Sequence, residues 1–191
     1  MKCLSIDASS TCIGWALWNE DKLLQYGKIK PIDENAHWRE RIKSLLFQLD
    51  EIIKTNKPQK IYCEDVPLMN KGGKATLVVL GAVQGSILGL CASNDIDIEF
   101  INVGHWRSRI GLYNGTSKGK ERDNLKIASI NLANELFKID LNCVLTKSGK
   151  YNEKKSDDDI ADSILLYASN FDKYCNRKKR GSFGGKEDKN K

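Results

Sequence analysis

Four acidic residues at the edges of apolar segments constrain the fold of this chain more than any other feature. Asp7 ends the apolar run at residues 3–7, and Glu64 ends a second run at residues 61–64. Asp159 and Asp162 lie three residues apart near the start of an apolar segment with helical spacing. An unpaired buried carboxylate loses several kcal/mol of solvation, so such residues are not placed there for stability. If the two strands are neighbours and the helix packs across them, the four carboxylates converge.

A cluster of carboxylates requires cations, and hard oxygen ligands suit Mg²⁺. The pattern therefore indicates metal-assisted phosphodiester hydrolysis. The helix acids also have a simpler interpretation, because Ser156-x-x-Asp159 is a capping-box pattern and acids favour a helix N-terminus. Asp162 lies beyond that cap. It is one turn from both Asp158 and Asp159, and the spacing leaves open which of them is its partner.

The order of the predicted elements indicates an α/β fold. Short turns separate three strands expected at residues 2–7, 13–18 and 22–30, which is typical of an antiparallel meander. A helix at about residues 36–54 then leads to a strand at 60–65, which we expect to run parallel to the first. The remaining predicted elements are a strand at 96–103 and helices at about 121–137 and 157–174. Together they predict a five-stranded mixed sheet flanked by helices.

Residues 75–92 form an almost uncharged stretch that is long enough to span a membrane. Three polar residues interrupt it: Thr76, Gln84 and Ser86. Because the flanking segments belong to one soluble domain, we expect a buried helix and no membrane contact. Three glycines share one face of this helix: Gly81, Gly85 and Gly89. Each costs a helix about 1 kcal/mol relative to alanine, so they indicate close approach of another backbone, either on the sheet or across a dimer.

The length of 191 residues fits one domain at about residues 1–172. Residues 173–191 carry the whole net charge of +6. We expect this tail to be disordered and to contact a polyanion, although a solubilising end without a partner gives the same composition. The start lacks the pattern of a signal peptide. None of the six cysteines forms a C-x-x-C pair, which suits a reducing cytoplasm, and Cys3, Cys63 and Cys91 are expected to be buried.

Three motifs in this order resemble the RNase H-like superfamily and, more closely, the RuvC Holliday junction resolvases. The first is Leu4-Ser5-Ile6-Asp7 with Ser10 and Gly14, and the second is Ile61-Tyr62-Cys63-Glu64-Asp65-Val66. The third is Asp159-Ile160-Ala161-Asp162-Ser163-Ile164. The resemblance covers roughly residues 2–172 in element order, and it favours Asp159 over Asp158 as the partner of Asp162.

The resemblance implies a homodimer that cuts two opposed strands of a four-way DNA junction and leaves 5′-phosphates. It also implies two Mg²⁺ ions per active site, replaceable by Mn²⁺, with Asp7 between Glu64 and the Asp159/Asp162 pair. The chain departs from the family in having Ala8-Ser9 after Asp7. It also has Pro67-Leu68-Met69 where bacterial members carry an aromatic wedge. We therefore expect a divergent member.

Basic residues near polar loops are the candidates for DNA contact, because such contact is mainly electrostatic. They are Lys71, Lys74, Lys118, Lys120, Arg122 and Lys150. The resemblance suggests that Lys120 assists catalysis. His105 follows a predicted strand, and we expect it to be structural or to face DNA.

Three other classes of protein share part of this pattern. Another RNase H-like nuclease would act on RNA–DNA hybrids or flaps, and a non-catalytic protein would bind junctions without cutting them. The actin-like sugar kinases also carry an Asp after the first strand, but this chain is too short for their two lobes. Four intact acids favour a nuclease.

Overall fold

The computed structural model describes residues 1–66, 73–112 and 121–175. Its centre is a five-stranded sheet in the order β3-β2-β1-β4-β5. The strands are β1 (Lys2–Ala8), β2 (Ile13–Asn19), β3 (Lys22–Ile29), β4 (Lys60–Glu64) and β5 (Asp97–Ile101). The first three pair antiparallel, whereas β4 is parallel to β1 and β5 is parallel to β4. The predicted meander and the parallel crossover are both confirmed.

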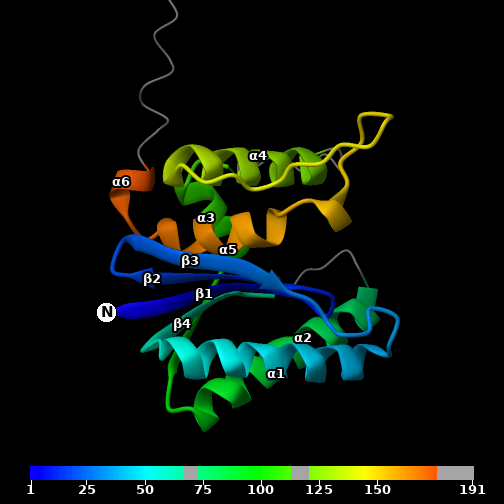
Figure 1. Ribbon diagram of the computed structural model, residues 1–191, viewed down its shortest axis with the longest axis vertical. Helices are drawn as coiled ribbons and strands as arrows, with labels where there is room; N and C mark the ends of the chain where they lie inside the picture. The colour runs from blue at the N-terminus through cyan, green and yellow to red at the C-terminus, as the bar shows by residue number, and fades with distance from the viewer. Residues whose placement is uncertain (67–72, 113–120, 176–191) are drawn as a thin grey trace, which may run out of the picture.

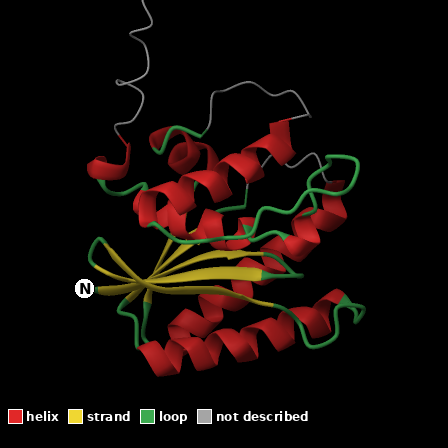
Figure 2. Cartoon of the chain, turned by 45° about the horizontal axis from the view of Figure 1, so that its top comes forward, coloured by secondary structure: helices red, strands yellow, loops and turns green. Residues whose placement is uncertain are grey.

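Helices cover both faces of the sheet, and the three layers are visible in Figures 1 and 2. On one face lie α1 (Trp38–Asn56) and α2 (Gly73–Ser93). On the other lie α3 (Val103–Arg109), α4 (Glu121–Phe137), α5 (Asp158–Ala168) and the short α6 (Asp172–Cys175). A single 3₁₀ turn, η1 (Glu153–Lys155), precedes α5. The sheet therefore separates two hydrophobic cores.

Strand alternation decides which residues enter each core. In β1, Leu4 and Ile6 join the core under α1 and α2, whereas Cys3 joins the core under α5. Because side chains alternate between the two faces, Asp7 lies on the same face as Cys3. The same alternation in β4 buries Ile61 and Cys63 against α1 and α2 and leaves Glu64 on the α5 face.

Helix α5 is the most deeply buried helix of the domain. Ten of its residues, from Asp158 to Ala168 with only Asp159 excepted, are buried. Gly14 of β2 makes the close packing possible, because a Cβ atom at this position would lie 2.0 Å from the carbonyl oxygen of Asp159. A glycine is therefore required where the first turn of α5 crosses β2.

Helix α2 differs from its prediction, because only one of its faces is buried. Val83, Ile87 and Cys91 are its buried residues. Among the described residues, a Cβ atom at any of the three glycines would meet no atom within 4 Å beyond its chain neighbours and its own helix backbone, so the glycine face does not pack on the sheet. By length and composition α2 could also cross a membrane. Its buried side packs in the core under the sheet with Leu4, Ile6 and Ile61, as expected for an element of a globular domain.

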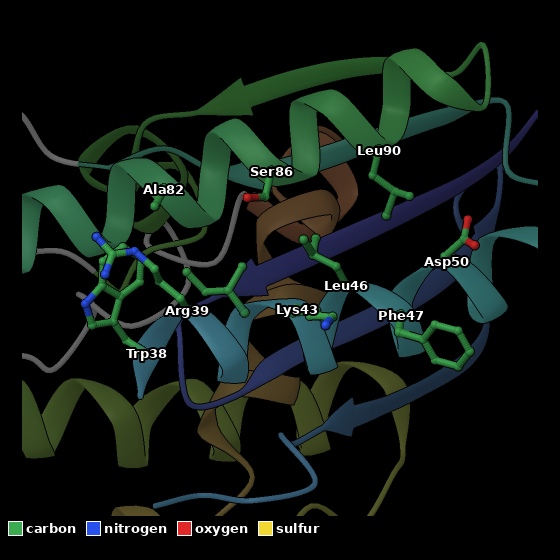
Figure 3. Close-up of a pocket in the computed structure, with 10 residues that line it drawn as sticks. Trp38, Arg39, Lys43, Leu46, Phe47, Asp50, Ala82, Ser86 and Leu90 are labelled. Atoms are coloured by element: carbon green, nitrogen blue, oxygen red, sulfur yellow. The ribbon is translucent and has the colours of Figure 1, made fainter. Parts of the chain in front are cut away.

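Figure 3 shows a groove between α1 and α2. Its volume is about 590 Å³, and Leu46 and Leu90 contribute to its apolar lining. Phe47 on its edge is 71% exposed. Val78 and Leu88 of α2 are also exposed, so this side of the molecule presents apolar side chains to solvent.

Two predicted elements need correction. The strand expected to continue to Val103 ends at Ile101, and α3 follows it; the sequence analysis did not predict α3. The helix expected at residues 157–174 is two helices, because i→i−3 hydrogen bonds from Asn170 and Phe171 close a turn after Ala168. Lys173 pairs with Asp21, so the first residues assigned to the tail belong to the packed domain, and residues 176–191 lie outside the described ranges.

Candidate active site

The parallel register of β1 and β4 brings the two strand acids together. Ile6 pairs with Cys63, so Asp7 and Glu64 are the next residues on neighbouring strands. Both lie at the carboxyl ends of their strands and on the α5 face of the sheet. The strand part of the predicted constellation is therefore present in this structure.

Helix α5 supplies the other two acids from above this edge of the sheet. Asp159 and Asp162 are three residues apart and therefore lie on the same face of the helix. The negative charges of both raise the pKa of Asp7. Gly14 pairs directly with Asp7 across the hairpin. Gly14, which leaves room for the backbone of Asp159, is thus the cross-strand neighbour of Asp7.

Burial and neighbouring charges shift the pKa values of three of these acids, Asp7, Glu64 and Asp159. Burial raises the pKa of Asp7 well above its ordinary value, and the charges of Glu64, Asp162 and Asp159 raise it further. Burial also raises the pKa of Glu64 to about 7, against the lowering effects of Arg107 and of a hydrogen bond from Trp106. Burial and the neighbouring Asp158 raise the pKa of Asp159. Like charges held together in this way oppose ionisation unless cations join them.

The contacts of Asp158 distinguish it from Asp159. Tyr151 donates a hydrogen bond of 2.6 Å to Oδ1 of Asp158, and Lys126 pairs with Oδ2. Both carboxylate oxygens are therefore engaged away from Asp7. Asp159 instead interacts with Asp7 and accepts a hydrogen bond from the Cys12 thiol. Of the two alternatives left by spacing, the geometry favours Asp159.

Helix α3 adds two residues to the site that the sequence patterns did not predict. Arg107 Nη2 lies 2.7 Å from Asp162 Oδ2, and Trp106 Nε1 donates a hydrogen bond of 2.9 Å to Glu64 Oε2. The available signal was Asn102, whose side chain caps α3 by accepting from the backbone of Gly104 and His105. Asn102 was a weak signal for a helix, because the helix is short and has a glycine in its first turn. His105 itself is exposed and forms no part of the cluster.

The donor set suits a hard divalent cation. All four acids offer oxygen ligands, and Oδ1 of Asp162 is buried without a hydrogen-bond partner among the described residues. Within the same residues, no three His, Cys, Asp or Glu side chains are arranged closely enough to hold one ion as they stand. Arg107 supplies a positive charge to the cluster in this arrangement. The chemistry of the ligands fits the cation, and the side chains would have to reorient to bind it.

The predicted DNA contacts lie partly within the described residues. Lys74 is exposed at the start of α2, and Lys150 is exposed in the loop before α5. Arg122 is also exposed and pairs with Glu153 at 3.0 Å. Lys71, Lys118 and Lys120 lie outside the described residues, as does the Pro67-Leu68-Met69 segment.

Comparisons with known proteins agree with the resemblance seen in the sequence. No model of a protein family matches the chain. It is 28% identical over 103 residues to the crossover junction endodeoxyribonuclease RuvC of Chlorobium phaeobacteroides. That match covers 52% of this chain and 54% of the relative, so the chain spans about half the length of the curated relative it matches.

Two solved structures of T. thermophilus RuvC match over most of both chains. The complex with a Holliday junction substrate has a TM-score of 0.59 at 13% identity, and a further RuvC structure has 0.58 at 14%. Each match covers 88% of this chain and 92% of the other. The predicted RNase H-like fold, with its five-stranded mixed sheet and flanking helices, is confirmed.

Proposed function

We propose that this protein is a RuvC-type endonuclease that resolves four-way DNA junctions by cutting two opposed strands. The observation that carries the proposal is the meeting of Asp7 and Glu64 with Asp159 and Asp162 at one edge of the sheet. The similarity to RuvC in fold and in part of the sequence supports the same conclusion. The two Thermus structures include one bound to a Holliday junction, which supports branched DNA as the substrate.

The four acids are the residues that would hold Mg²⁺ or Mn²⁺, with two ions per active site. Such ions would lower the pKa of the attacking water and stabilise the leaving 3′-oxygen. Trp106 fixes one oxygen of Glu64 through its indole N–H and so orients the carboxylate. Gly14 allows the backbone of Asp159 to approach β2, which places the helix acids above Asp7.

Arg107 provides positive charge inside the cluster. Its guanidinium faces Asp162, and its charge lowers the pKa of both Asp7 and Glu64. In the proposed reaction this charge keeps the acids ionised and faces the negative charge of the scissile phosphate. Arg107 is therefore a further candidate for DNA contact among the described basic residues, in addition to Lys74, Arg122 and Lys150.

A homodimer would let two active sites cut symmetric positions of one junction. The exposed apolar face of α2, with Gly81, Gly85 and Gly89, is the surface that we assign to a second copy. Glycines allow two helices to approach closely, and none of the described residues fills the space above them. Val78 at 63% and Leu88 at 50% exposure add apolar area to that face.

Cleavage of assembled four-way junctions tests the function directly. The wild-type protein should cut two opposed strands of an immobile junction in Mg²⁺ and leave linear duplex intact. RNA–DNA hybrids and flapped duplexes are assayed in parallel. Cleavage of hybrids or flaps with no cleavage of junctions would replace the proposal with another nuclease of this fold, and binding without any cleavage would replace it with a junction-binding role.

A further inference from the structure

The connection between α4 and α5 is an ordered hairpin-like segment, which we call the finger (residues 142–157). Its two arms are joined by backbone hydrogen bonds. Thr146 N donates to Lys150 O at 2.7 Å, and Asn152 N donates to Val144 O at 2.9 Å. An isolated bridge between Leu145 and Tyr151 continues the pairing. These hydrogen bonds give the connection a defined conformation, unlike most surface loops, which are more mobile.

The base of the finger is fixed to the sheet. Asn142 donates from its backbone N and its Nδ2 to Oδ2 of Asp157, at 2.8 and 2.9 Å. Lys28 of β3 lies 2.7 Å from Oδ1 of the same carboxylate. Ser156 closes the arms by accepting from Val144 N at 2.9 Å. The finger therefore begins and ends at one anchored point.

A buried ion pair fixes the finger to the first turn of α5 and to α4. Tyr151 of the finger and Lys126 of α4 bind the two oxygens of Asp158, whose side chain is 2% exposed. Lys126 also lies 2.5 Å from Glu153, on the same arm as Tyr151. Since Asp158 directly precedes Asp159, the finger and the candidate active site share one rigid support.

The finger carries positive charge that the described part of the protein does not neutralise. Its acids are already engaged, Glu153 by Arg122 and Lys126, and Asp157 by Lys28. Four exposed lysines have no ion pair to any described residue: Lys147, Lys150, Lys154 and Lys155. Basic residues beside the acid cluster, Arg107 and Lys126, are by contrast paired.

We propose that the finger is a pre-organised surface for DNA phosphates, which holds the backbone of the strand that enters the acid cluster. The inference rests on the proposed function and names the part of the protein that holds the DNA beside the cut. Figure 1 shows the finger, in yellow, projecting on the side toward which β1 runs. A fixed support for lysines lowers the entropy lost when phosphates bind. The unpaired positive charge of the segment that leads into the first turn of α5 identifies a polyanion as the ligand.

The salt dependence of DNA binding tests the finger without requiring cleavage. The test compares Lys147→Gln/Lys150→Gln with the control Lys43→Gln/Lys54→Gln, whose exposed lysines lie on α1 across the sheet. Binding to a fluorescent four-way junction is measured by anisotropy in Ca²⁺ at several KCl concentrations. Removing one lysine that binds a phosphate should lower the slope of log K against log salt by about 1, so we expect a decrease of about 1–2 for the finger variant and none for the control.

The possible results distinguish failure of the finger proposal from failure of the proposed function. An unchanged slope in the finger variant, in a wild-type protein that binds and cuts junctions, would overturn the finger alone. A lowered slope in a protein that binds DNA and cuts no junction would leave the finger standing and overturn the function. A wild-type protein that binds no DNA would overturn both. Adding Lys154→Gln and Lys155→Gln should lower the slope again, and circular dichroism checks that each variant is folded.

Discussion

Helices α5 and α2 pack on opposite faces of one sheet and use their residues in opposite ways. Helix α5 buries Asp158 and Asp162 together with its apolar residues. Helix α2 is almost free of charge, yet it buries only Val83, Ile87 and Cys91. Buried charge and exposed apolar surface are the two departures from ordinary burial that carry information. The first marks the candidate active site, and the second marks the proposed dimer surface.

Neutralising the buried acids should give the largest effect on the α5 side. Asp7→Asn, Glu64→Gln and Asp162→Asn each remove a ligand charge with little change in volume. We expect cleavage of junctions to fall to background, while junction binding survives because it depends on basic residues. Gel assays of cleavage and anisotropy of binding measure the two separately. The control Glu99→Gln, an exposed acid on β5, should cut normally, and full turnover in any of the three variants would remove that acid from the site.

Exchanging the metal ion tests the candidate active site on the α5 side without any mutation. Mg²⁺ and Mn²⁺ should support cleavage. Ca²⁺ should support binding without turnover, because it coordinates loosely at about 2.3–2.6 Å and positions water poorly. Single-turnover cleavage in each metal is the measurement. Efficient cleavage in EDTA would contradict the proposed mechanism.

A pair of identical substitutions sharpens the contrast between the two helices. Gly14→Ala places a methyl group against the backbone of Asp159, and overpacking of this kind should cost about 3 kcal/mol of folding stability. Gly81→Ala adds the same group to open space on α2, where the gain in helix propensity should stabilise the fold by about 1 kcal/mol. Urea unfolding measures both. Equal effects of the same sign would show that the two faces are not packed differently.

The last prediction concerns the assembly of two chains. Gly85→Leu fits the open space on α2 in one chain, but in a dimer it would separate the helices at a cost of about 1–3 kcal/mol. We expect a shift towards monomers with an unchanged fold, and a loss of paired cuts within one junction.

Light scattering measures the shift, and Thr55→Leu on the exposed side of α1 is the matched control. A Gly85→Leu protein that stays dimeric would move the interface elsewhere. A monomeric wild-type protein that resolves junctions completely would exclude the dimer.

The sequence predicted the sheet and the order of the acids, because strand alternation and helical spacing are local patterns. Spacing left the choice between Asp158 and Asp159 open, since both lie about one turn from Asp162, and only the family resemblance favoured Asp159. That choice depends on Tyr151 and Lys126, which no local pattern connects to α5. Arg107 was missed for the same reason, because its partner Asp162 lies on a different helix. The exposure of the glycine face could not be read from a stretch whose composition resembles a core helix.

The pairing of Gly14 with Asp7 also limits how the chain can change in length. The loop between β1 and β2 spans only residues 9–12, and Ser9 closes it by hydrogen bonds to Cys12. One inserted residue that shifted the register of β2 would bring Ile13 or Trp15 opposite Asp7 in place of Gly14. Its side chain would occupy the space of the Asp159 backbone and displace α5. Insertions and deletions in this hairpin should therefore be eliminated as strictly as loss of an acid, although no residue of the loop itself need touch DNA.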